Sequence, residues 1–281
     1  MNSPVSSIIL SIITFIYGFS ALLYISQWIF RTEKPGKLAS WAVIIGGTGN
    51  LIGILLRWRE SYQLGFGHAP LSNMYESLVF FACSIAFIWL FVEYRYKNRL
   101  IGAFAMPLAF LAMAYASLSP NISDRIQPLI PALKSNWLIA HVITCFLGYA
   151  GFAIAFGISI MYILRQRDRI STSLSVRLPG AEELDDLTHK MVQFGFLFLS
   201  VGIITGAVWA NSAWGRYWGW DPKETWSLIT WFIYAGLLHA RLMRGWHGRK
   251  IAYISIIGFM AVLFTYFGVN LLPGLHSYST Q

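Results

Sequence analysis

The sequence predicts an all-α protein, a polytopic helical bundle that crosses a membrane about eight times. Of its 281 residues, 56% are hydrophobic and only 12% are charged, whereas roughly a quarter of the residues in a typical soluble domain are charged. The mean hydropathy is +0.56. The apolar residues gather in stretches near the ~20 residues with which a helix crosses ~30 Å of hydrocarbon. This composition excludes a soluble enzyme.

Eight apolar stretches have the length of a membrane span. They cover residues 7–30, 39–56, 75–94, 100–118, 137–164, 191–210, 225–242 and 251–272. The first has no basic residue ahead of it and a basic cluster behind it, which is typical of a retained span rather than a cleaved signal peptide. The whole chain, 1–281, is therefore predicted to form a single membrane domain.

The net charge of +9 reflects membrane topology. Fifteen of the 21 Lys and Arg residues fall in alternate loops, and the remaining loops hold the other six. The positive-inside rule places the richer loops, including 165–190, in the cytoplasm. Both termini and the segment 211–226 are then predicted on the outer, periplasmic or lumenal, side. No nucleic-acid partner is expected.

Two of the predicted spans begin with helix-capping sequences. Asn73 and Asp221 each stand three positions before a Glu, and Pro222 occupies the first helical position of the second. Spans three and seven are thus predicted to start near Asn73 and Asp221, both at the outer surface.

The two cysteines, Cys83 and Cys145, lie in separate apolar runs. Neither belongs to a C-x-x-C motif, so a disulfide scaffold and a zinc site are not indicated. Both are interpreted as small packing residues.

Tryptophan is concentrated in one outer segment. Six of the 12 Trp residues lie between Trp209 and Trp231. An interfacial aromatic belt is the alternative interpretation, but a belt needs only one or two such residues at each helix end. Clustered aromatic faces form a slab-shaped apolar site, to which Gly215 and Gly219 allow a flat ligand close approach. The aromatic residues proposed to contact such a ligand are Trp214, Tyr217, Trp218, Trp220 and Trp226.

Charged residues of the same segment complete the predicted ligand chemistry. Arg216 and Lys223 can pair with carboxylates on the rim of a ligand, so a porphyrin fits the site. Asp221 is included among the candidate contacts, with helix capping as its alternative role.

The segment Trp-Gly-x-Tyr-Trp-x-Trp-Asp-Pro-Lys-Glu-Thr-Trp, residues 214–226, resembles the WWD signature of haem-handling proteins. The closest match is the CcsA/ResC family of the System II cytochrome c maturation pathway. The resemblance also covers Pro70–Ser77, the chain from Gly206 to His239, and the segment from Gly268 to His276. Tyr217 departs from related families, which often place a second Trp there.

This resemblance implies a function. The chain would carry haem b from the cytoplasmic side to the external segment 211–226 and present it for thioether attachment to an apocytochrome c with a C-x-x-C-H motif. A CcsB/ResB-type membrane protein is the implied partner, and thiol-reducing factors would act beside it. Holocytochrome c synthase activity is expected only together with that partner. The implied location is a bacterial plasma membrane or a thylakoid membrane.

The resemblance also implies the ligands of the haem iron. His141, about one turn inside span five, and His276, after span eight, match the family's external axial histidines; the alternative for each is a polar helix-end residue. His239 lies 18 residues after Asp221, about 27 Å deeper at 1.5 Å per residue. It matches the histidine that receives haem on the cytoplasmic side, and its alternative is an inner-interface residue beside Arg241.

The other three histidines receive no ligand role. His68 lies in an outer loop, and His189 and His247 lie among inner-loop charges, although His189 is close enough in the topology to face His239. Two other functions remain open at this point: a solute transporter, for which polar residues at mid-membrane are typical, and a b-type electron-transfer cytochrome, which needs paired His ligands at one depth.

Overall fold

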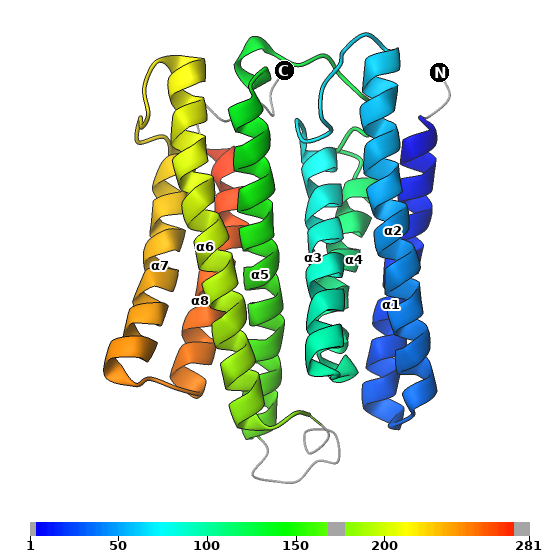
Figure 1. Cartoon of the computed structure of the whole chain (residues 1–281), viewed down its shortest axis with the longest axis vertical. Helices are drawn as coiled ribbons and strands as arrows, with labels where there is room; N and C mark the ends of the chain where they lie inside the picture. The colour runs from blue at the N-terminus through cyan, green and yellow to red at the C-terminus, as the bar shows by residue number, and fades with distance from the viewer. Residues whose placement is uncertain (1–3, 168–177, 273–281) are drawn as a thin grey trace. The chain divides into compact units, whose positions relative to one another are not determined.

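The computed structural model describes residues 4–167 and 178–272, and every regular element in these ranges is a helix. The chain divides into two compact units. Unit 1 comprises Met1–Lys134 and Asp168–Pro179, and unit 2 comprises Ser135–Arg167 and Gly180–Gln281. Each unit contains four long helices that run alternately up and down (Figure 1). The prediction of an all-α helical bundle is confirmed.

Unit 1 is a four-helix ring. Its helices are α1 (Val5–Phe30), α2 (Glu33–Gln63), α3 (Met74–Tyr96) and α4 (Gly102–Leu118), with the 3-10 turns η1 (Arg99–Ile101) and η2 (Pro131–Leu133). Contacts join each helix to the next and α4 back to α1. Short connections between antiparallel neighbours are typical of such bundles.

A buried ion pair joins α2 to α3 inside unit 1. Arg57 Nε donates to Glu76 Oε1 at 2.8 Å, and the two side chains are 2% and 1% exposed. Asn73 Oδ1 accepts a hydrogen bond from the Glu76 amide at 2.9 Å, so the predicted cap of this helix is confirmed. Breaking a buried pair leaves an uncompensated charge, and the pair therefore fixes how these two helices pack.

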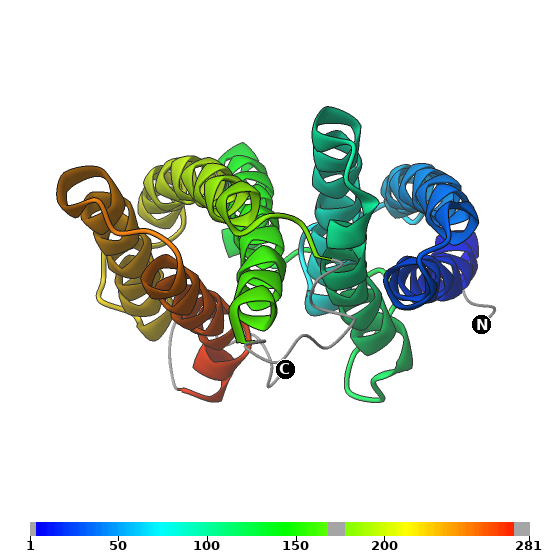
Figure 2. The ribbon, with the colours of Figure 1, turned by 90° about the horizontal axis from the view of Figure 1, so that it is seen from below.

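Unit 2 is a second ring and holds the tryptophan-rich segment. Its helices are α5 (Asn136–Arg167), α6 (Ala181–Trp214), α7 (Pro222–Arg244) and α8 (Arg249–Tyr266), followed by the 3-10 turn η4 (Gly268–Leu271). Contacts join α5 to α6, α6 to α7, α7 to α8 and α8 to α5, and Figure 2 shows these helices end-on. The alternating directions bring the start of α5, the end of α6, the start of α7 and the end of α8 to one end of the unit (Figure 1).

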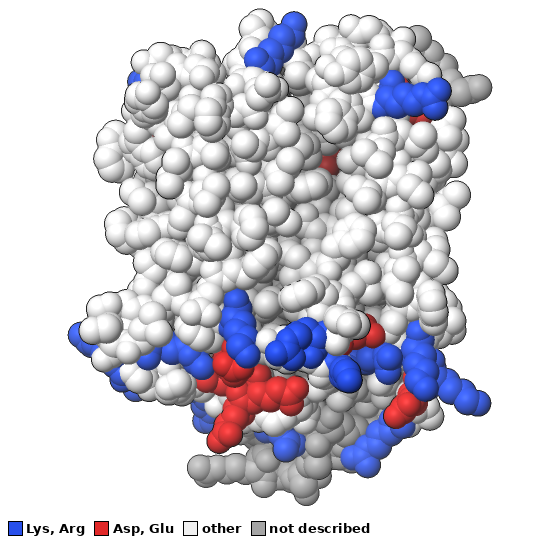
Figure 3. All heavy atoms as spheres, viewed as in Figure 1, with Lys and Arg blue, Asp and Glu red and all other residues white. Residues whose placement is uncertain are grey.

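Seven of the eight long helices in the described ranges are long and apolar enough to cross a membrane. The exception is α7, whose sequence includes Trp226, Thr230, Trp231, Tyr234 and His239, residues that a hydropathy scale counts as polar or weakly apolar. On the face shown in Figure 3, charged side chains gather near the ends of the helices, most of them at one end, and the middle is almost wholly uncharged. This distribution is that of a multi-pass membrane protein.

The loops on either side of α6 are shorter than the sequence indicates. Residues 165–190 are predicted to be a solvated loop, with a short surface helix as the alternative for part of it; α5 extends to Arg167, and α6 begins at Ala181. The first turns of α6 form an amphipathic helix, in which Leu184 and Leu187 are buried while Glu182 and Glu183 remain exposed. At the other end of α6, only residues 215–221 of the predicted segment 211–226 are non-helical. We call residues 215–221 the tryptophan loop.

Candidate functional site

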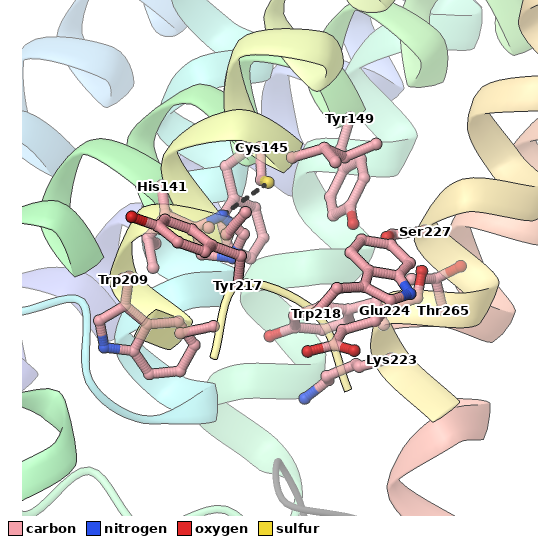
Figure 4. A pocket seen from close by; sticks show the side chains of 17 residues that line it. His141, Cys145, Tyr149, Trp209, Tyr217, Trp218, Lys223, Glu224, Ser227 and Thr265 are labelled. Carbon is pink, nitrogen blue, oxygen red and sulfur yellow. Dashed lines mark hydrogen bonds between the residues drawn. The ribbon is translucent and has the colours of Figure 1, made fainter. Parts of the chain in front are cut away.

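The end of unit 2 that holds the tryptophan loop contains a cavity of about 200 Å³. All four helices of the unit and the loop contribute to its wall, which is mostly apolar and aromatic. Figure 4 shows His141 and Cys145 on one side of it and Trp218, Glu224, Ser227 and Thr265 on the other. The lining residues are His141, Val142, Cys145, Phe146, Tyr149, Ile203, Gly206, Ala207, Trp209, Ala210, Tyr217, Trp218, Lys223, Glu224, Ser227, Thr265 and Tyr266.

His141 is held by α6 on two sides of its ring. Its Nδ1 lies 2.7 Å from the carbonyl oxygen of Gly202, and its ring stacks on Trp209 with centroids 6.0 Å apart and planes 14° apart. A carbonyl oxygen can only accept, so Nδ1 carries the proton and donates it. The lone pair of the neutral ring is then on Nε2.

The cysteine beside His141 shares its cavity. The Sγ atom of Cys145 lies 3.6 Å from His141 Nδ1, and its thiol is buried. The prediction of a buried, unpaired packing cysteine agrees with this position, since Cys83 and Cys145 are both free.

Glu224 closes the tryptophan loop. Its Oε2 accepts hydrogen bonds from the amides of Gly219 at 2.7 Å and Asp221 at 3.1 Å. In return, the Asp221 side chain accepts from the Glu224 amide, which completes a capping box at the start of α7. Asp221 Oδ2 also accepts from the Lys223 amide at 3.1 Å. The alternative role given to Asp221, a helix cap, is confirmed.

The loop also bends sharply at two residues. Gly215 ends α6 with φ of 74°, a conformation that glycine adopts without strain. Trp220 has φ of 56°, where a side chain is strained by about 1 kcal/mol or more. The two amides held by Glu224 flank this residue, and the Trp220 indole is 70% exposed. The carboxylate of Glu224 therefore keeps Trp220 in a strained turn that presents its ring to the surroundings.

The structure separates the predicted aromatic contacts into two groups. Tyr217 and Trp218 line the cavity, whereas Trp214, Trp220 and Trp226 are not among its lining residues. Trp214 meets Trp209 edge-on with centroids 4.9 Å apart, and Trp226 packs on Phe264 of α8 at 4.2 Å. Trp214 therefore contacts a residue of the cavity wall, whereas Trp226 packs on a residue of α8 that does not line the cavity.

Polar groups at the cavity are few. Lys223 lines it, whereas Arg216 is exposed and lies against Gly219. The indole Nε1 of Trp218 is buried and has no hydrogen-bond partner within the described residues. An unpaired buried donor is costly, so this atom is suited to donate to an acceptor on a ligand.

His239, the other predicted ligand within the described residues, does not line this cavity. His276 falls outside the described residues. His239 is on α7, 18 residues after Asp221, and its side chain is exposed. His68 is buried in unit 1, with Nε2 2.9 Å from the Gln127 carbonyl oxygen and Nδ1 3.1 Å from that of Ala69.

His189 and His247, the two histidines predicted to lie among cytoplasmic charges, are at the opposite end of unit 2 (Figure 1). His247 Nδ1 lies 3.2 Å from Asp185, which also pairs with Arg241. His189 has a buried Nδ1 without a hydrogen-bond partner among the described residues.

Several lining residues were not predicted from the sequence. Cys145 and Tyr149 follow His141 at intervals of four on α5, and Trp209 follows Gly206 at an interval of three on α6. These intervals are the signal that each set shares one helix face. The sequence does not say that the two faces meet, because that depends on which helices pack together.

Comparisons with known proteins agree with this architecture. A family model described as cytochrome C assembly protein matches residues 71–276. The cytochrome c biogenesis protein CcsA of Heterosigma akashiwo (strain NIES-293 / 8280G21-1) is 41% identical, over 94% of this chain and 89% of that protein. CcsA of Prochlorococcus marinus (strain NATL2A) is 36% identical, over 93% of each chain.

A solved structure shares the fold. The cytochrome c heme lyase CcmF matches 96% of this chain with a TM-score of 0.69 and 14% sequence identity. The match covers 51% of that chain, so the present protein spans about half its length.

Proposed function

Because this chain belongs to the CcsA family of cytochrome c assembly proteins, we propose that it binds haem b at the cavity of unit 2 and presents it for attachment to apocytochrome c. Haem is the cargo of this function rather than a resident cofactor. It would bind with His141 as an axial ligand and with the aromatic wall against the macrocycle.

The observation that carries the proposal is the state of His141. The hydrogen bond from Nδ1 to Gly202 fixes the tautomer and directs the lone pair to Nε2. In metal sites, a hydrogen bond donated by the ring nitrogen that does not bind the metal orients the histidine ligand and raises its basicity. Neutral imidazole is a common axial ligand of haem.

A macrocycle bound at this wall would be only partly enclosed. Its volume of about 200 Å³ is below the roughly 300–1,000 Å³ of pockets that enclose a drug-sized ligand. Tyr217 lines the cavity and is 60% exposed, so the cavity reaches the surface there. A site of this kind leaves one edge of the ring accessible, as attachment to another protein requires.

The propionates of haem would meet donors on the same wall. The indole Nε1 of Trp218 has no partner within the described residues, Lys223 lines the same wall, and the exposed Arg216 would pair with a carboxylate at the rim. Charge-assisted hydrogen bonds of this type fix orientation as well as affinity. We therefore assign these three side chains to orienting the ligand.

The remaining parts of the proposal lie beyond the cavity. His276 would supply the second axial ligand, and His239 would receive haem at the inner end. Bound haem supplies two vinyl groups, across which the thiols of the C-x-x-C-H motif add. The residues of this chain would contribute positioning, and a CcsB/ResB-type partner, with thiol-reducing factors, would complete the synthase.

Attachment itself is the direct test. The chain should be expressed with a CcsB/ResB-type partner and an apocytochrome c, and covalent haem should be measured on the denatured cytochrome. We expect attached haem with both proteins present and none when the two motif cysteines are replaced by Ser. Haem bound to the chain without any attachment would favour a b-type electron carrier. A chain purified without haem, and without attachment, would favour a transporter.

The proposal also requires an orientation. Tags at residues 1, 70 and 281 should be accessible from the outer side, and a tag at residue 180 from the cytoplasm, when intact cells are labelled with an impermeant reagent. The physical reason is the charge asymmetry of the loops. If labelling places the tryptophan loop in the cytoplasm, the site is on the wrong side for attachment and the proposal is rejected.

A further inference from the structure

The face of α6 that meets His141 lacks a side chain at one critical position. A Cβ atom built on Gly206 would lie 2.6 Å from Nδ1 and 2.7 Å from Cε1 of His141. Such distances are well inside van der Waals contact, which for carbon begins near 3.5 Å. The imidazole therefore occupies space that exists only because residue 206 is glycine.

The same face supplies the other contacts of the ring. One turn earlier, the Gly202 carbonyl accepts from Nδ1 at 2.7 Å, and one turn later Trp209 stacks on the ring. A Cβ on Gly202 would meet Cys145 Sγ at 2.6 Å and its backbone nitrogen at 3.2 Å, so this glycine lets α5 approach closely. Gly202, Gly206 and Trp209 thus lie on one stripe of α6, directly against His141.

We propose that Gly206 is a positioning residue for the iron ligand. Its missing side chain sets where the ring lies, while Gly202 sets the tautomer and Trp209 sets the ring plane. This inference rests on the proposed function of His141. A methyl group at residue 206 would push the imidazole aside, because the His141 side chain can rotate and the helix backbone cannot. This movement would break the hydrogen bond from His141 to Gly202.

A purely structural glycine would behave differently. Alanine is the better helix former, so Gly206→Ala would raise helix stability if the position had no close neighbour. The α5–α6 interface contains a matched control in Gly195. A Cβ there would lie 2.6 Å from the ring of Phe152 and 2.9 Å from the Gly148 carbonyl oxygen, a clash on the same helix pair that is at least as severe and does not involve His141.

The experiment compares full-length Gly206→Ala and Gly195→Ala proteins, each purified in detergent after expression in cells that make haem. The readouts are haem per mole of folded protein and the electron paramagnetic resonance spectrum, which reports the orientation of axial imidazoles. We expect Gly206→Ala to lose haem about tenfold, as for other groups that orient a metal ligand, or to shift the spectrum. Gly195→Ala should lower the yield while the remaining protein keeps normal haem content and spectrum.

The outcomes separate this inference from the proposed function. If His141→Gly leaves haem content and spectrum normal, the proposed function fails. If His141→Gly has a low haem content or an altered spectrum, while Gly206→Ala is normal in both, the inference alone is overturned. An equal effect of Gly195→Ala on haem per folded protein would also overturn it.

A second pair of variants tests the inference even if the Gly206→Ala protein does not fold. In His141→Gly the ring is absent, so an added methyl at residue 206 meets no imidazole and the double variant should fold. Imidazole added from outside should restore haem binding in His141→Gly and should need about ten times more ligand in His141→Gly/Gly206→Ala. Equal rescue of the two proteins, or failure of the double variant to fold, would overturn the inference.

Discussion

Replacing His141 with Gly is expected to abolish covalent attachment of haem to apocytochrome c. Loss of a group that merely orients a metal ligand already costs roughly 10–100-fold in affinity, so loss of the ligand itself should exceed that range. Attachment is measured as covalent haem per mole of cytochrome, with the partner protein co-expressed. The variant should remain folded, because the side chain is only partly buried.

Added imidazole should partly restore attachment in His141→Gly. The substitution leaves a space in which a free imidazole can donate to the Gly202 carbonyl and stack on Trp209, as the native ring does. A suitable control is His68→Gly, because His68 is buried between two carbonyl groups of unit 1. That variant should lower protein stability and show no rescue by imidazole. Normal attachment by His141→Gly would mean that this histidine is structural.

The helices could be predicted because the length of an apolar stretch depends only on neighbouring residues in the sequence. Each of the eight predicted stretches lies largely within one helix of the structure, and both predicted caps start the expected helices. The ends of α6 were predicted less well. Its first turns bury only one face, and a membrane-length apolar run does not detect such an amphipathic segment.

The candidate site was predictable only in part. The motif identified the aromatic cluster, but sequence spacing does not distinguish Trp218, which lines the cavity, from Trp226, which packs on Phe264. That difference depends on the turn at Gly215 and on the two amides held by Glu224. The partners of His141 were missed for a related reason, since Gly202 and Trp209 lie more than 60 positions away in sequence.

Replacing His239 with Ala is expected to lower the amount of haem that reaches the outer site in cells. Over the helix from Asp221 to His239, the two ends are about 27 Å apart, so His239 cannot bind the same iron as His141. Its side chain is exposed on a face of α7 where Gly236 leaves open space beside it. If haem enters there, haem per mole of folded protein should fall about tenfold, at the lower end of the range for a disturbed metal site.

The competing role for His239, packing at the inner interface, predicts a different result. Loss of a packing residue would reduce the abundance of the protein together with its haem, whereas replacing an exposed side chain usually changes stability by at most about 0.5 kcal/mol. We therefore expect normal abundance, low haem content, and full occupancy once haem is supplied from the outer side to the purified protein, because the His141 site is intact. His247→Ala is the matched control, an exposed histidine near the same end of unit 2 that contacts Asp185. Full haem occupancy of His239→Ala protein made in cells would exclude entry at this residue.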